Sequence, residues 1–203
     1  DLSAGLDYYA WLAATEFKKI PALITVADSA AKQAETVKNF KKQQEQFETV
    51  LEEERNFMDQ VSFLYEQTIN AGQGMTANDD TWKQKAAAIA ELKRNKNAYK
   101  QLSGERLFDF CWRLCGEQYF WLQESKRYRE AYRTAYILSF FDDTRRNPDY
   151  MMAKAAAGLA DKPLCMQHLK KAVKNPNLTK QVVLRERLIT TLIDIETIER
   201  LFK

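Results

Sequence analysis

The chain has 203 residues, of which 45% are hydrophobic and 12% aromatic, so it can bury a core and is not a disordered chain. Its formal net charge is +3, but residues 1–75 carry 7 basic and 12 acidic side chains, whereas residues 76–203 carry 24 and 16. Because acids and bases are mixed along the second part, its basic excess is typical of a solvated helical surface. It also allows a face for nucleic acid or lipid.

The composition predicts an all-α fold, since Gly and Pro number only 6 and 4 and strong helix formers prevail. No apolar run approaches the roughly 20 residues of a membrane-spanning helix, so we predict no membrane span. Because the chain begins with Asp1 and not with Met, we expect a preceding segment to have been removed, and the residues assign no compartment.

The first elements in chain order are two predicted helices. Residues 6–27 form an amphipathic pattern that Pro21 should kink or split. A polar pattern without Gly or Pro then predicts one long helix over about 29–70, or two helices in near-continuous register. Its apolar positions form a heptad-like seam, which predicts self-association through this helix. The seam consists of Val37, Phe40, Phe47, Leu51, Met58, Val61 and Tyr65.

Glycines mark the predicted helix boundaries between residues 72 and 104. Residues 72–74, Gly-Gln-Gly, should end the long helix, and a further helix is predicted over about 81–102. The pair Ser103-Gly104 should break that helix. The organisation expected is therefore an N-terminal helical region, 1–103, and a C-terminal region, 104–203, either as separate parts or as one continuous domain.

Residues 119–138 and residues 153–172 have similar patterns of apolar and small residues. We call the offset in residue number between these two segments the repeat spacing. Each segment predicts a helix, a short polar turn and a second helix. At the repeat spacing Ala131 corresponds to Cys165, and such small residues are needed where the two helices of a hairpin cross closely. After the second hairpin, residues 179–202 predict a single capping helix, which would cover the apolar end of the stack.

A helix–turn–helix period of about 34 residues resembles the tetratricopeptide-repeat family, here over about residues 107–175. Residues 126–131 resemble that family's turn into its second helix, with Lys126 at a position where the family has glycine. The resemblance implies antiparallel hairpins in a right-handed superhelical stack. It also implies a scaffold or adaptor that binds a peptide or protein in a groove.

Catalytic patterns are missing from the sequence. His168 is the one histidine, which excludes a two-histidine zinc site, and we expect it at the surface or in a groove. No glycine-rich phosphate loop or nucleophile elbow is present. Asp142, Asp143 and Asp149 do not have the spacing of a magnesium-binding aspartate motif. We therefore expect no enzyme, no cofactor and no metal. The cysteines are interpreted as small buried residues; they are Cys111, Cys115 and Cys165.

The best functional candidate is a basic and aromatic cluster. Three tyrosines spaced at i, i+4 and i+8 share one helix face, with two arginines in the adjacent stripe. Such residues can bind an acidic peptide or protein. Two alternatives stay open: the tyrosines pack between hairpins, or the same residues bind nucleic acid. The candidate partner-binding residues are Trp121, Tyr128, Arg129, Tyr132, Arg133, Lys170 and Lys171, with Tyr136 completing the tyrosine face.

Overall fold

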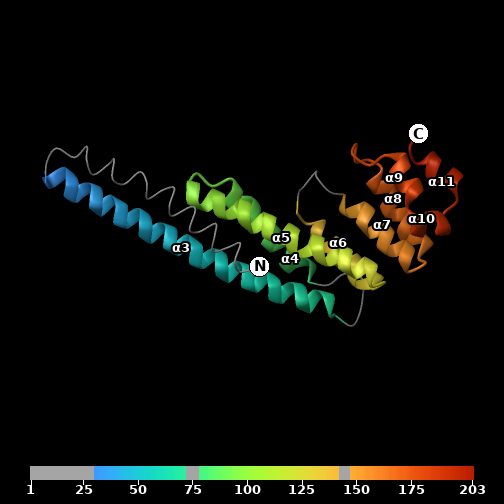
Figure 1. Ribbon diagram of the computed structural model, residues 1–203, viewed down its shortest axis with the longest axis horizontal. Coiled ribbons are helices and arrows are strands. Elements are labelled where there is room, and N and C mark those ends of the chain that lie inside the picture. Colours follow the sequence, from blue (N-terminus) through green and yellow to red (C-terminus); the bar gives the residue numbers. More distant parts are fainter. Residues whose placement is uncertain (1–29, 72–77, 142–146) are drawn as a thin grey trace. The chain divides into compact units, whose positions relative to one another are not determined.

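The computed structural model describes residues 30–71, 78–141 and 147–203, and within these ranges it is all-α, without a strand (Figure 1). This confirms the predicted all-α class. None of the helices in these ranges is long and apolar enough to cross a membrane. The helices are α3 (Ala30–Ile69), α4 (Asp79–Lys93), α5 (Ala98–Glu124), α6 (Tyr128–Leu138), α7 (Pro148–Gly158), α8 (Lys162–Ala172), α9 (Lys180–Arg185), α10 (Arg187–Leu192) and α11 (Ile195–Arg200).

The chain divides into two compact units, residues 1–52 and 53–203. In the first unit the described residues belong to the N-terminal part of α3, and the predicted helix over 6–27 lies outside the described residues. The second unit holds the remainder of α3 and all later helices. The predicted long helix over 29–70 is confirmed as α3. Its self-association stays a prediction.

The part of α3 in the second unit is helical because no breaker interrupts it and one face is apolar. Val61, Leu64, Tyr65 and Ile69 recur at helical spacing and are buried in a core shared with α4, α5 and α6. The Gly-Gln-Gly segment expected to end this helix lies outside the described residues. The observed end at Ile69 is consistent with its expected position.

The predicted break at Ser103-Gly104 is wrong. Helix α4 ends at Lys93, and α5 begins at Ala98 and continues through both residues. Asn97 sets the new boundary, because its side-chain oxygen accepts hydrogen bonds from the backbone N–H groups of the second and third residues of α5, at 2.9 and 3.2 Å. A capping asparagine therefore starts this helix well before the expected break.

Gly104 serves close packing. It is buried, and a Cβ atom placed on it would lie 2.6 Å from the backbone nitrogen of Lys93 and 2.8 Å from the carbonyl carbon of Leu92. The main chains of α4 and α5 approach each other here, which only a residue without a side chain permits.

We expect Gly104→Ala to lower the free energy of unfolding by about 1–3 kcal/mol, because the new methyl group would overlap main-chain atoms that cannot rotate away. This loss outweighs the gain in helix propensity. Chemical denaturation measures it. Gln101→Ala, an exposed change in the same helix, should stay within about 0.5 kcal/mol of wild type. Equal stability of Gly104→Ala and wild type would contradict the close approach.

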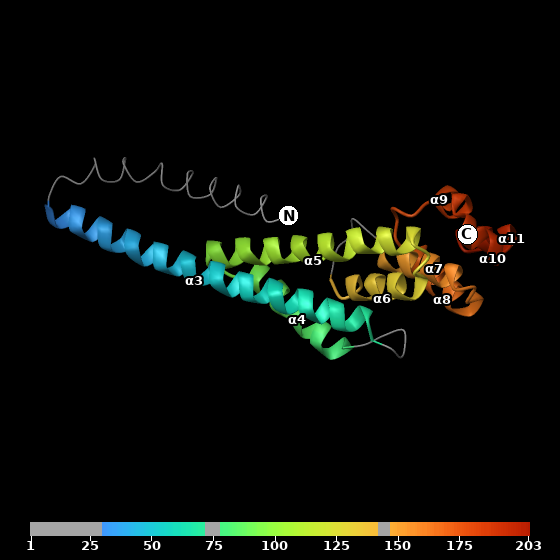
Figure 2. The same ribbon diagram turned by 60° about the horizontal axis from the view of Figure 1, so that its bottom comes forward.

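Two antiparallel hairpins follow one another, α5 with α6 and α7 with α8, and they are visible side by side in both views (Figures 1 and 2). Their turns share one hydrogen-bond pattern at the repeat spacing. The N–H of Arg127 donates to the carbonyl of Leu122 at 2.8 Å, and the N–H of Asp161 donates to the carbonyl of Ala156 at 3.0 Å. This closure is the Schellman end of a helix.

The residue before each donor has a left-handed backbone. Lys126 and Ala160 both have φ of 58°, and they too are separated by the repeat spacing. This conformation favours glycine, and it costs a residue with a Cβ atom about 1–2 kcal/mol. The two turns are therefore alike in geometry and carry the same local strain.

Lys126→Gly and Ala160→Gly should each raise the free energy of unfolding by about 1 kcal/mol, because glycine relieves the left-handed strain. Thermal and urea denaturation test this. Gln118→Gly, at an exposed interior position of α5, should instead lower stability by about 1 kcal/mol. Destabilisation by both turn substitutions would contradict the backbone conformation described.

The single capping helix predicted over 179–202 is wrong, because three short helices, α9 to α11, occupy that range (Figure 1). Extended backbone at Glu186 separates α9 from α10, and extended residues at Ile193 and Asp194 separate α10 from α11. The breaks allow apolar residues from all three helices to reach one core with α7 and α8. The buried members are Ala153, Ala156, Ala157, Cys165, Leu169, Val183, Ile189, Ile193 and Ile198.

Candidate partner-binding surface

Helix α6 carries most of the predicted residues, and the structure places two of them in the interior. Tyr132 and Arg133 are only 4% and 3% exposed. The Nη1 atom of Arg133 donates to the carbonyl oxygen of Ile69 at 2.7 Å. That carbonyl belongs to the last residue of α3, where helix ends leave unpaired acceptors and a partial negative charge. Arg133 therefore binds the end of α3 and does not face a partner.

Tyr132 belongs to a chain of hydrogen bonds that joins three helices. Its hydroxyl lies 2.7 Å from Nε2 of His168, and Nδ1 of His168 lies 2.8 Å from Oδ1 of Asp149. With a neutral imidazole, Nδ1–H donates to the carboxylate and Nε2 accepts from the phenol, so each group is satisfied. His168 is 5% exposed, so the expected surface position is wrong. Its two polar partners make burial possible.

The other tyrosines of the predicted face also contact neighbouring helices. The Tyr136 hydroxyl donates to Oδ2 of Asp79, the first residue of α4, at 2.7 Å. Tyr128 packs against the end of α7, because a Cβ on Gly158 would lie 2.4 Å from its ring. The tyrosine face is thus used for packing between helices, which was one of the two alternatives left open by the sequence.

Four predicted residues are exposed: Trp121, Arg129, Lys170 and Lys171. The two lysines lie in the last turn of α8, where positive side chains are favoured by the helix dipole. Trp121 is 53% exposed near the end of α5. Its neighbour Phe120, which sequence reasoning missed, is 54% exposed. The signal was present, since the pattern that buries Tyr119 and Leu122 turns the two residues between them outward.

Trp121 lies beside a charged turn. The Arg127 guanidinium carbon is 5.6 Å from the centroid of the Trp121 ring, and its Nε and Nη2 both donate to Oε1 of Glu130 at 3.1 Å. Arg129 is exposed in the first turn of α6. We call Phe120, Trp121, Arg127, Arg129 and Glu130 the turn cluster. It combines a large apolar surface with cations on an ordered hairpin.

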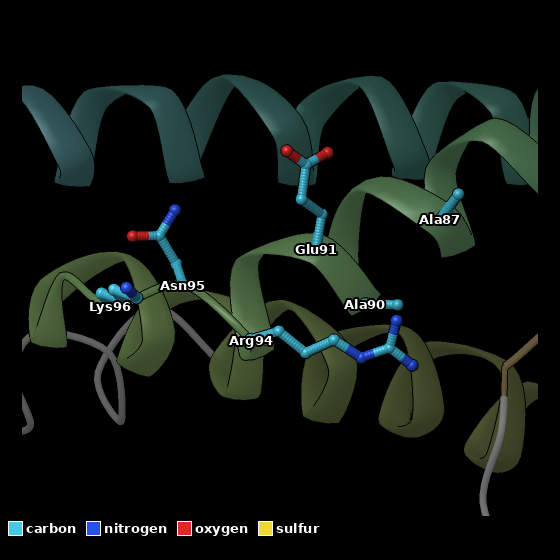
Figure 3. Close-up of a pocket in the computed structure, with 6 residues that line it drawn as sticks. All are labelled: Ala87, Ala90, Glu91, Arg94, Asn95 and Lys96. Carbon is cyan, nitrogen blue, oxygen red and sulfur yellow. The ribbon is translucent and has the colours of Figure 1, made fainter.

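A pocket of about 710 Å³ lies elsewhere, at the C-terminal end of α4 (Figure 3). Its charged side chains do not converge, because Glu91 and Arg94 point to opposite sides of the helix in this view. Within the described ranges, no three His, Cys, Asp or Glu side chains are grouped so that they could hold a metal ion. Asp142 and Asp143 lie outside those ranges.

Comparison with known proteins adds no relative, since no family model, curated protein or solved structure matches the chain. The candidate surface depends on the geometry of this chain alone.

The Tyr132 phenol is the most testable part of the buried chain. Burial, and then the nearby carboxylates of Asp149 and Asp161, raise the pKa of Tyr132 from 10.0 to about 12. A raised pKa in the folded state means that the stabilisation is complete below pH 10 and is lost as the pH rises through 12.

Tyr132→Phe should lower the free energy of unfolding at neutral pH by about 1–3 kcal/mol, since Nε2 of the buried His168 loses its partner. The difference from wild type should shrink in alkaline solution as the wild-type phenol ionises. Urea denaturation across the pH range measures both effects. In a double-mutant cycle with His168→Leu the two losses should not add. Additive losses, or a difference independent of pH, would contradict the contact.

Proposed function

We propose that the C-terminal part of the chain, 104–203, is a non-enzymatic tetratricopeptide-like interaction module that binds an acidic protein or peptide. The matching turns support this, because capping hydrogen bonds and left-handed residues recur at the repeat spacing. The contacts of α6 with α7 and of α10 with α7 are those expected when successive hairpins stack. The finer arrangement, a right-handed superhelix, belongs to the same proposal.

The observation that carries the proposal is the exposed Trp121 with Arg127 against its ring. Tryptophan and arginine are among the residues most enriched where binding energy concentrates at protein interfaces. A folded chain gains by burying a tryptophan, so one left half in water on an ordered turn is available to a partner. Arg127 is already paired with Glu130, and Arg129 adds a further cation. This combination suits a partner with carboxylates beside an apolar side chain.

Self-association through α3 stays a secondary proposal that the turn cluster does not require. Catalysis is not part of the proposal, because the charged groups around the α4 pocket diverge. The Tyr132 hydroxyl and both ring nitrogens of His168 are already used in hydrogen bonds within the fold. A scaffold needs neither converging charged groups nor a reactive side chain in a cavity.

The double substitution Trp121→Ala/Arg129→Glu should reduce the amount of captured partner about ten-fold or more without changing the fold, because it removes the aromatic anchor and reverses an exposed charge. Capture from a lysate of the source organism, quantified by mass spectrometry, measures this. The matched control is Phe63→Ala/Arg187→Glu, which removes another exposed aromatic residue and reverses another exposed arginine.

Recovery of the same partners by wild type and by Trp121→Ala/Arg129→Glu would show that the turn cluster is not the interface. Binding of the wild-type chain to generic RNA or DNA would instead favour nucleic-acid binding by the basic half of the chain. That function predicts affinity for generic RNA or DNA that falls steeply with salt, since each phosphate contact releases a counterion.

A further inference from the structure

A second surface feature lies along α4, in residues that no predicted role includes. It adjoins the pocket at the end of this helix and shares Ala87, Ala90 and Arg94 with it. Helix α4 presents small alanines in its middle and cations towards both ends, and phenylalanines from α5 and from just after α6 face them. Together they line an open groove of about 500 Å³. The groove is lined by Lys83, Ala86, Ala87, Ile89, Ala90, Lys93, Arg94, Phe108, Phe140 and Phe141.

The floor of the groove is apolar and held in place by ring contacts. Phe141 meets the buried Trp82 edge to face, with ring centroids 6.5 Å apart. Phe140 meets Tyr136 in the same way at 5.1 Å. Both geometries are favourable aromatic pairs. Because Ala86 and Ala90 are short, space remains above them that a longer side chain would have filled.

The rim of the groove is positive. The Nζ atom of Lys93 lies 4.0 Å from the centroid of the Phe108 ring, so this cation is held over that ring. Arg94 follows it at the end of α4, and Figure 3 shows its guanidinium extending back beside Ala90. Lys83, at the other end, is 3.4 Å from Asp80, so part of its charge is already balanced. Among the described lining residues, the stronger positive charge therefore lies at the Lys93 end.

We propose that this groove binds an alkyl carboxylate, with the aliphatic chain over the alanines and Phe140 and the carboxylate at Lys93 and Arg94. The volume falls within the range of roughly 300–1,000 Å³ common for small-molecule sites, which are mainly apolar with a few polar groups. Charge complementarity selects an anion, and arginine binds a carboxylate through paired N–H groups. A wholly polar anion would leave uncovered the apolar side chains of the groove that are exposed or partly exposed, which are Ala86, Ala87, Ala90 and Phe140. The site shares no residue with the turn cluster and does not depend on it.

Isothermal titration calorimetry of the full chain with decanoate, kept below its micelle concentration, tests the proposal. Wild type should bind decanoate, and decyltrimethylammonium, which has the same chain and the opposite charge, should bind at least ten-fold more weakly. Lys93→Glu/Arg94→Glu should weaken decanoate binding at least ten-fold. Lys41→Glu/Lys42→Glu, the matched reversal of two adjacent exposed lysines in α3, should leave it unchanged.

The proposal would be overturned by the absence of heat with decanoate, by equal binding of the two surfactants, or by full binding of decanoate by Lys93→Glu/Arg94→Glu. Circular dichroism establishes whether each variant is folded. If charge reversal unfolds the chain, Lys93→Gln/Arg94→Gln removes the charges more gently and should still weaken binding. Ala90→Trp, which fills the groove and keeps the rim charges, should also abolish binding. Unchanged affinity in Ala90→Trp would place the ligand elsewhere.

Discussion

The second unit depends on the hydrogen bonds that helix α6 makes with its neighbours. Within one stretch of this short helix, Tyr132 bonds to His168 of α8, and Thr134 bonds to Tyr65 of α3 at 3.0 Å. Arg133 binds the end of α3, and the Tyr136 hydroxyl binds the start of α4. Buried polar groups are costly unless each finds its partner. Helix α6 therefore fixes the places of α3, α4 and α8 together, and a shift of any one leaves a polar atom unsatisfied.

This internal use of α6 limits which of its side chains stay exposed. A helix rich in tyrosine and arginine has the composition of an interface, yet most of these side chains here are committed to other helices. The side chains left exposed flank the turn into α6, with Trp121 in the last turn of α5 and Arg129 in the first turn of α6. Because the turn is continuous with the hydrogen-bonded helix, its exposed residues are held on a rigid support. Rigid anchors lose little entropy on binding.

Periodicity predicted which residues share a helix face but not what that face meets. The all-α class, helix α3 and the turn into α6 followed from spacing and breakers. Glu54 lies in the most polar stretch of α3 but is only 2% exposed. Its Oε1 atom is 2.9 Å from Nη2 of Arg106. Burial raises the pKa of Glu54 more than the Arg106 cation lowers it. His168 is buried for a similar reason. Each depends on a partner distant in sequence, which local patterns do not contain.

The two hairpin turns show how geometry can persist when its usual residue is absent. Glycine is the preferred residue for a left-handed helix end, yet Lys126 and Ala160 both take that conformation. Their strain is offset by what the turns hold together: the closing hydrogen bonds and the contact of Tyr128 with Gly158. Tertiary packing therefore imposes the turn on residues that do not favour it. A sequence pattern that requires glycine at this position does not detect that the two turns are alike. Their likeness is visible only in the structure, where the closing hydrogen bonds recur at the repeat spacing.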